Sequence, residues 1–316
     1  MFNNSHLIMI FSCLVVVATT AMASSAPTPP HSVLAPGAAL QKLAGGFLFT
    51  EGGASDAKGN VFFTDQPNDR LWEWSVDGKL SVFLQPCGRS NGLCVDKDGS
   101  LWACADENNQ LWKIARDKKT GAAGPVQVVL KSDGDGKLLN GPNDVWVSPT
   151  TGGGLFFTDP LYKRPYWKRD PAMQPKGQYV YHARTDGKGL RIVADDLKQP
   201  NGIVGTADGK TLYVADIGDG KTYVYDIAPN GALKNKKLFY PMGSDGMTID
   251  NEGNIYLTGK GVTVVDKAGK LVETIPVAEA WTGNICFGGR DRKTLFITAS
   301  TGLYSIQTRT HGVGSQ

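Results

Sequence analysis

The sequence predicts an all-β fold, a six-bladed β-propeller of four-stranded antiparallel blades that is closed by an N-terminal strand. Six segments begin with an oxygen-bearing residue beside a small one, and each continues as an apolar strand, a turn and a second apolar strand. A repeat of roughly 40–55 residues with β patterning inside each unit is typical of propeller blades. We call the first position of each dipeptide a spoke. The six dipeptides are Glu51-Gly52, Asn91-Gly92, Asn143-Asp144, Asn201-Gly202, Asp245-Gly246 and the degenerate Gly283-Asn284.

Each unit also supplies strands for the outer part of its blade. The chain has 39 glycines, which suit many tight hairpins, and long stretches with helical periodicity are absent. The sixth unit ends one strand short, so we expect residues 40–49 to supply that strand and cover the exposed edges. The expected outer strands are 71–74 and 79–84, 111–114 and 126–130, 179–182 and 189–193, 222–227 and 236–240, 261–266 and 270–275, and 295–299 and 303–307.

The first residues read as a targeting segment. Residues 7–21 carry no charge, and Ala21-Met22-Ala23 offers a small-x-small cleavage site, although the first six residues lack Lys and Arg. We therefore predict a signal peptide over 1–23, a disordered or extended leader over 24–38, and the propeller over 39–316. The expected location is periplasmic or secreted, without membrane association after cleavage, and the expected state is a monomer or small homo-oligomer.

Net charge and cysteine content limit the kinds of partner and site that the chain supports. The net charge is +3 and no basic run occurs, which gives no support for nucleic-acid binding. Four cysteines would survive cleavage, and an even number in an exported protein permits disulfides. Cys94 and Cys104 lie in apolar strands, where buried free thiols are expected. His182 also lies within a strand, and we interpret it as structural. A disulfide bond from Cys87 remains possible, but the sequence defines no partner for it. Cys286 is the fourth of these cysteines.

The spokes carry the candidate chemistry because a propeller directs equivalent residues of its blades toward one axis. Glu51, Asn143, Asn201 and Asp245 would place two carboxylates and two amides around that axis. Such hard oxygen donors suit Ca²⁺, whereas Zn²⁺ usually recruits His or Cys. Any one dipeptide alone would more often be a turn, but each precedes the innermost strand of its blade. Asn91 is assigned to the substrate or to the groups that surround the metal ligands, and Gly283 brings no side chain.

Several motifs together resemble the gluconolactonase/regucalcin-like (senescence-marker-protein) family of six-bladed propeller lactonases. These are residues 49–56, 139–145, 156–160, 199–203 and 244–247. The resemblance implies one catalytic divalent cation, usually Ca²⁺ with Zn²⁺, Mn²⁺ or Mg²⁺ as alternatives, and a small-molecule lactone as substrate. It implies that Glu51, Asn201 and Asp245 hold the metal and that Asn143 completes the shell or contacts substrate. Asp245 would be the catalytic acid/base, and Asp159 falls where some relatives place a substrate-contacting acid.

The chain departs from the family pattern in places. Gly53 replaces the usual proline after Glu51-Gly52, and Gly141 stands where some relatives carry an arginine anchor. After Thr158-Asp159-Pro160, residues 161–169 form a segment rich in cations and aromatics instead of a short Pro-Tyr-Gly turn. Two interpretations of this segment are open: a substrate wall over the site, or a solvated surface loop.

The predicted function is metal-dependent hydrolysis of a sugar lactone, with the cation polarising the carbonyl and Asp245 relaying the proton of the attacking water. No Gly-x-Ser-x-Gly elbow and no phosphate-cradling glycine loop occurs in the sequence. The alternatives are hydrolysis of organophosphates or other esters on the same calcium site, and a non-catalytic ligand-binding propeller.

Overall fold

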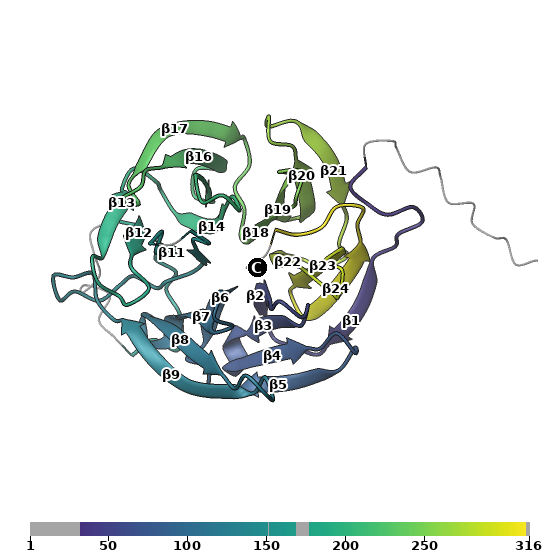
Figure 1. The fold of residues 1–316 in the computed structure, drawn as a ribbon, viewed down its shortest axis with the longest axis horizontal. Coiled ribbons are helices and arrows are strands. Elements are labelled where there is room, and N and C mark those ends of the chain that lie inside the picture. The colour runs from purple at the N-terminus through teal and green to yellow at the C-terminus, as the bar shows by residue number, and fades with distance from the viewer. Residues whose placement is uncertain (1–31, 151, 169–176, 314–316) are drawn as a thin grey trace, which may run out of the picture.

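The predicted six-bladed β-propeller is confirmed. The computed structural model describes residues 32–150, 152–168 and 177–313, and these form six antiparallel four-stranded sheets around a central axis (Figure 1). The predicted signal peptide and most of the predicted leader lie outside the described residues. In the part of the chain that is described, no helix has the length and apolar character needed to span a bilayer.

Each sheet runs from an inner strand at the axis to an outer strand at the rim. The first three blades are β2 (Thr50–Ser55), β3 (Val61–Asp65), β4 (Arg70–Trp74) and β5 (Leu80–Leu84); β6 (Ser90–Val95), β7 (Leu101–Ala105), β8 (Gln110–Arg116) and β9 (Ala123–Leu130); and β10 (Val145–Val147), β11 (Leu155–Asp159), β12 (Tyr179–Ala183) and β13 (Arg191–Ala194). The fourth and fifth are β14 (Pro200–Gly205), β15 (Thr211–Asp216), β16 (Lys221–Ile227) and β17 (Leu233–Tyr240); and β18 (Met247–Ile249), β19 (Ile255–Gly259), β20 (Gly261–Val265) and β21 (Leu271–Ile275). The sixth is β22 (Thr282–Gly288), β23 (Thr294–Ala299), β24 (Gly302–Gln307) and β1 (Gln41–Gly45), and two short 3₁₀ turns lie at Gln66–Asn68 and Asp106–Asn108.

The N-terminal strand closes the ring as predicted. β1 pairs antiparallel with β24, with Gln41 opposite Ser305 and Gly45 opposite Gly302. The chain before β1 continues this contact, because Val33 is 3% exposed within the core of the last blades and Leu34 forms an isolated bridge with Thr308. The described end of the predicted leader therefore packs against blade six and makes a turn at residues 35–38.

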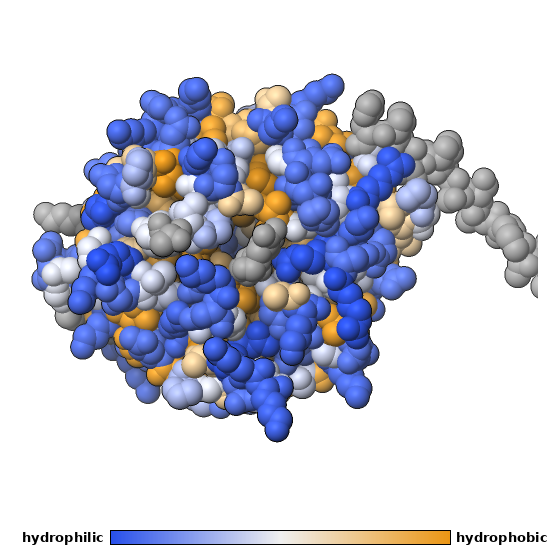
Figure 2. All heavy atoms as spheres, viewed as in Figure 1, coloured by the Kyte–Doolittle hydropathy of each residue, from blue (hydrophilic) through white to orange (hydrophobic). Residues whose placement is uncertain are grey.

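The second strand of a blade carries a continuous apolar run because both faces of the sheet pack on neighbouring blades. In β3 and β11, Phe62, Phe63, Phe156 and Phe157 are all fully buried. Side chains that alternate between two buried faces leave no solvent-facing position, so the sequence shows a continuous apolar run in place of strict alternation. At the surface, apolar residues occur in small groups among hydrophilic ones (Figure 2).

Threonines that follow these apolar runs join neighbouring blades at the axis. The hydroxyls of Thr64, Thr158 and Thr258 donate to main-chain oxygens at the spoke of the next blade, at 3.1, 2.7 and 3.0 Å. The acceptors are the carbonyls of Asn91, Asn201 and Gly283. Each bond ties the spoke of the second, fourth or sixth blade to the preceding blade. The three bonds therefore hold the axial residues in fixed positions relative to one another.

The four described cysteines are free, so the bridge left open at Cys87 is not formed. Burial raises the pKa of the Cys94 thiol to about 11, as expected for an unreactive thiol inside the sheet stack. His182 lies buried in β12, and its Nε2 is 3.1 Å from the carbonyl of Gly153. This contact agrees with a structural histidine.

Candidate axial metal centre

The structure brings the four predicted metal-holding spokes to the inner end of their blades, where all four are buried. Glu51 and Asn201 lie in β2 and β14, and Asn143 and Asp245 each come two residues before β10 and β18. Their exposed fractions are 2, 1, 3 and 9% for Glu51, Asn201, Asn143 and Asp245. A buried ring of polar side chains needs partners, because desolvation without compensation is costly.

Three of these spokes carry a buried oxygen that no hydrogen-bond donor among the described residues reaches. They are Oε2 of Glu51, Oδ1 of Asn143 and Oδ1 of Asn201. A buried unsatisfied acceptor costs about 1–3 kcal/mol, so three such atoms at one axis indicate a site built for a ligand. Carboxylate and amide oxygens are the donors that Ca²⁺ accepts in variable geometry, and the residues therefore fit a hard divalent cation.

The fifth spoke, Asp245, is held between two donors. Asn201 Nδ2 donates to its Oδ1 at 2.9 Å, and the indole Nε1 of Trp281 donates to its Oδ2 at 2.6 Å. Trp281 was not anticipated from the sequence, although it lies two residues before the degenerate sixth spoke. The two bonds orient the carboxylate at the axis, and both leave a lone pair on each oxygen for a further ligand.

Electrostatics at the axis favour a bound positive charge. Burial, followed by the charges of Asp245 and Asp144, raises the pKa of Glu51 well above its usual range. Burial also raises the pKa of Asp245 to about 6, against the opposing hydrogen bonds from Trp281 and Asn201. A cation among these carboxylates would stabilise their ionised forms.

Asp144 is a third axial carboxylate that sequence reasoning missed. It is 7% exposed, burial and the charge of Asp245 raise its pKa, and Asn284 Nδ2 donates to its Oδ1 at 3.1 Å. The signal was the Asn143-Asp144 dipeptide, where most other units carry glycine after the spoke. Gly92 makes room for this side chain, since a Cβ added there would overlap Asp144 Oδ1.

The sixth spoke, Gly283, leaves room for the side chain of a neighbouring spoke. A Cβ added to Gly283 would lie 3.1 Å from Oε2 of Glu51, so glycine leaves the Glu51 carboxylate its place at the axis. Asn91 occupies the equivalent spoke of the second blade and is 3% exposed. Its assignment to the substrate stays a prediction.

Asp159 anchors a main-chain segment, and its contact with the substrate stays a prediction. It is fully buried at the end of β11, and its oxygens accept the main-chain N–H groups of Asn140 and Gly141 at 2.9 and 2.8 Å. These two residues lead directly into Asn143. The carboxylate therefore anchors the segment that carries a spoke, because a charge that accepts backbone N–H groups fixes the chain locally.

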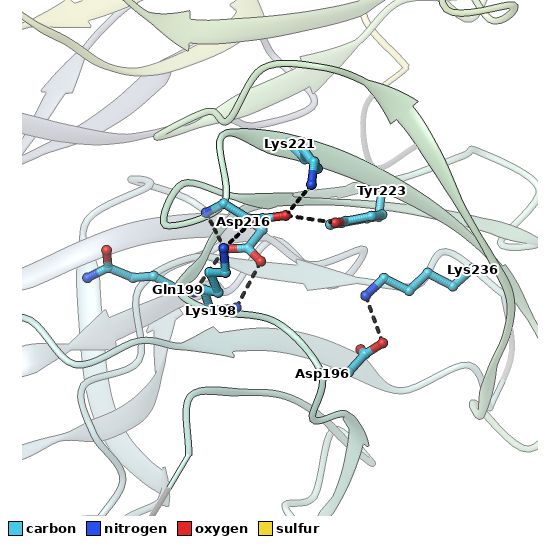
Figure 3. A network of polar contacts seen from close by, with 8 residues as sticks. Asp196, Lys198, Gln199, Asp216, Lys221, Tyr223 and Lys236 are labelled. Carbon is cyan, nitrogen blue, oxygen red and sulfur yellow. Dashed lines mark hydrogen bonds and ion pairs between the residues drawn. The ribbon is translucent and has the colours of Figure 1, made fainter.

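The same anchor recurs in other blades. Asp216, at the equivalent end of β15, accepts the N–H groups of Lys198 and Gln199 at 2.8 and 2.9 Å, just before Asn201 (Figure 3). Asp65, at the end of β3, accepts the N–H groups of residues 48 and 49 before the first spoke. A repeated Thr-Asp or Ala-Asp at the end of the second strand thus positions the first, third and fourth spokes.

We expect Asp159→Asn to lower the free energy of unfolding by about 2 kcal/mol, because the new amide NH₂ would face a main-chain N–H. Cation affinity should fall by roughly 10-fold, as is usual when a group behind a metal ligand is lost. Thermal melts and calorimetric cation titration measure both. Asp216→Asn is the matched control and should behave alike; a higher KM for Asp159→Asn with unchanged stability and cation affinity would instead restore a substrate contact.

The cation-rich and aromatic segment folds over the axial site. From this segment, Arg164 Nε and the Tyr166 hydroxyl donate to Oδ2 of Asp106 at 2.9 and 2.6 Å, and the Trp167 indole donates to the Asp106 carbonyl at 3.0 Å. Asp106 is 3% exposed at the top of the second blade. These contacts argue against a free surface loop for residues 161–168, which we call the wall; its role toward a substrate stays a prediction, and residue 169 lies outside the described residues.

The wall reaches the axis through Tyr162. Its hydroxyl accepts a hydrogen bond of 2.8 Å from Asn201 Nδ2, and burial followed by the charge of Asp245 raises its pKa. The positive charge of Arg164, which lies 5.1 Å above the Tyr162 ring, counteracts the pKa rise at Glu51 and Asp245. An aromatic, cationic wall thus borders the carboxylate ring.

A cavity among the described residues lies elsewhere along the inner strands. It measures about 710 Å³, has Asp144 and Asn284 among its lining residues, and extends along the inner strands to the C-terminal His311 and Val313. None of the three unpartnered oxygens belongs to its lining. A smaller recess of about 450 Å³ includes Trp281 and Met242, next to Asp245. The unpartnered oxygens and Asp245 therefore favour a candidate site at the end of the axis that carries the spokes, beside the smaller recess.

Comparisons with known proteins agree with this architecture. The model of a protein family described as SMP-30/Gluconolactonase/LRE-like region matches residues 49–301. A gluconolactonase of Zymomonas mobilis is 28% identical over 302 residues, covering 86% of this chain and 82% of that protein. A solved structure described as a putative gluconolactonase is 32% identical with a TM-score of 0.80, covering 90% of this chain and 98% of that chain. A gluconolactonase structure from Xanthomonas campestris is 28% identical with a TM-score of 0.76, covering 88% and 91%.

Proposed function

Because this chain belongs to the SMP-30/gluconolactonase/LRE-like family, we propose that it hydrolyses a sugar lactone to the aldonic acid with a divalent cation on the propeller axis. Lactone hydrolysis is supported by the relatives, which are gluconolactonases by name. The observation that carries the cation is the set of three buried, unpartnered oxygens on Glu51, Asn143 and Asn201.

These three residues and Asp245 would hold the cation. Ca²⁺ is the first choice because it tolerates variable oxygen coordination, and Zn²⁺, Mn²⁺ and Mg²⁺ are the alternatives. When bound, the cation would polarise the lactone carbonyl and stabilise the charge that develops on it.

Asp245 is proposed as the proton relay. Its carboxylate takes a proton from water while the water oxygen bonds to the carbonyl carbon, and it returns the proton to the ring oxygen when the ring C–O bond breaks. Trp281 and Asn201 keep the carboxylate oriented during both transfers. A carboxylate bound to a cation is a weak base, so the site would suit a lactone better than an amide.

The remaining parts of the proposal concern substrate and location. Asn91 and Asn143 would contact the lactone hydroxyls, and the segment 161–168 would form one wall of the substrate site. The protein would reach the periplasm or the exterior through the signal segment at residues 1–23. Organophosphate or other ester hydrolysis, and ligand binding without turnover, are the rival functions of the same site.

The test is acid release from glucono-1,5-lactone, followed with a pH indicator. We expect chelation to lower the rate of the purified protein by on the order of 10²-fold or more, since carbonyl polarisation is worth several kcal/mol, and added Ca²⁺ to restore it. The spontaneous hydrolysis rate of the lactone is the baseline. A cation bound by calorimetry without any acid release would reject lactone hydrolysis, and activity that resists chelation would reject the cation.

A further inference from the structure

We propose that the hydroxyl of Tyr162 donates a hydrogen bond to the lactone carbonyl oxygen as negative charge develops on it. This role rests on the proposed function and adds a catalytic residue to it. The hydroxyl lies at the inner edge of the wall formed by residues 161–168, directly against the Asn201 spoke.

The first step of the argument is the orientation of the Asn201 amide. Oδ1 of Asp245 lies 2.9 Å from one amide atom of Asn201. An ionised carboxylate only accepts hydrogen bonds, so that amide atom must be the NH₂ group. The amide oxygen then points the other way, and it is the buried atom without a donor among the described residues.

The second step is the direction of the bond to Tyr162. The same NH₂ group lies 2.8 Å from the Tyr162 hydroxyl, so the tyrosine oxygen accepts. A phenol has one O–H, and within the described part of the chain no acceptor is paired with that of Tyr162. Its proton is therefore available to a molecule in the site.

The third step is preorganisation. Arg164 and Tyr166, two and four residues further on, both bond the buried carboxylate of Asp106, and the Arg164 guanidinium lies 5.1 Å from the Tyr162 ring. A donor held in place before the reaction stabilises developing charge without reorganisation. One amide thus presents its oxygen to the axis and its NH₂ to Tyr162, which places the free O–H beside the position proposed for the carbonyl.

The chemistry needs no proton from Tyr162. As the water oxygen bonds to the carbonyl carbon, the C=O electron pair moves to the carbonyl oxygen, and the phenol keeps its proton while donating to that oxygen. Asp245 carries the transferred proton to the ring oxygen. The phenol is neutral before and after turnover.

The test is Tyr162→Phe, measured in kcat, KM and calorimetric cation affinity. We expect kcat for glucono-1,5-lactone to fall by about 10²-fold, as for the loss of one oxyanion donor, while KM and the cation Kd change by less than about threefold. Tyr225→Phe is the matched control. Tyr225 is 4% exposed in the same blade as Asn201, and its hydroxyl has no partner among the described residues. It should keep the wild-type kcat.

A binding measurement separates a catalytic from a structural role. Affinity for a cyclic phosphonate that mimics the tetrahedral intermediate should fall with kcat/KM in Tyr162→Phe, whereas affinity for gluconate should hold. An unchanged kcat overturns the role, and so does a loss of cation affinity as large as the loss of activity. A wild-type protein that binds the cation yet releases no acid overturns the proposed function itself, and the Tyr162 role with it.

Discussion

Asp245→Asn should abolish lactone hydrolysis, with kcat lowered by about 10³-fold or more, and leave the propeller folded. The amide cannot take a proton from water, and proton transfer by a positioned group contributes roughly 10²–10⁴-fold. The change also removes one of the two negative charges proposed to hold the cation. Acid release gives kcat, and a thermal melt followed by circular dichroism reports the fold.

Asp250→Asn provides the matched control because this second carboxylate lies in the same blade, at the opposite end of the inner strand β18 from Asp245. Asp250 is 1% exposed and accepts the N–H of Asn254 at 2.9 Å and the Tyr256 hydroxyl at 3.0 Å. Its replacement should lower the melting temperature while kcat of the folded protein stays at the wild-type value. Retention of more than about a tenth of kcat in Asp245→Asn would remove Asp245 from the chemistry.

Deletion of residues 1–45 should destabilise the protein by about 5 kcal/mol, because it removes the closing strand and the apolar residues packed beneath it. Burial of one aliphatic side chain is worth roughly 1.5–3 kcal/mol, and Val33, Leu40 and Leu43 all pack against the last or first blade. The deletion also leaves β24 with an unpaired edge, which favours association between chains. Denaturant titration and size-exclusion chromatography measure these two effects.

A shorter deletion, of residues 1–31, keeps every described N-terminal contact and is the control for the truncation. It should match the full chain in stability and elution volume. If both truncated proteins are equally stable, the closure by β1 contributes little, and the packing between first and last blades alone must hold the ring.

The candidate centre was predictable in part because propeller blades repeat in phase. A side chain at the start of one inner strand must lie near its equivalents, so the residues at four spokes could be assigned to the axis from the repeat alone. The same logic passed over Asp144, since it occupies the position after the spoke, where other blades need glycine to pass close to their neighbours. It also gave no sign that two main-chain N–H groups from an earlier loop occupy the Asp159 carboxylate, because that contact is not local in the sequence.

The sequence by itself determined the all-β class, the six blades, the closing strand and the family, because these follow from local strand patterns that recur in register. Only the tertiary structure decided what surrounds the spokes. Asp106 meets Arg164, Tyr166 and Trp167 across 58–61 residues of chain, and Tyr162 meets Asn201 across 39. Such contacts depend on where irregular segments fold back over the ring, and no local periodicity encodes that path.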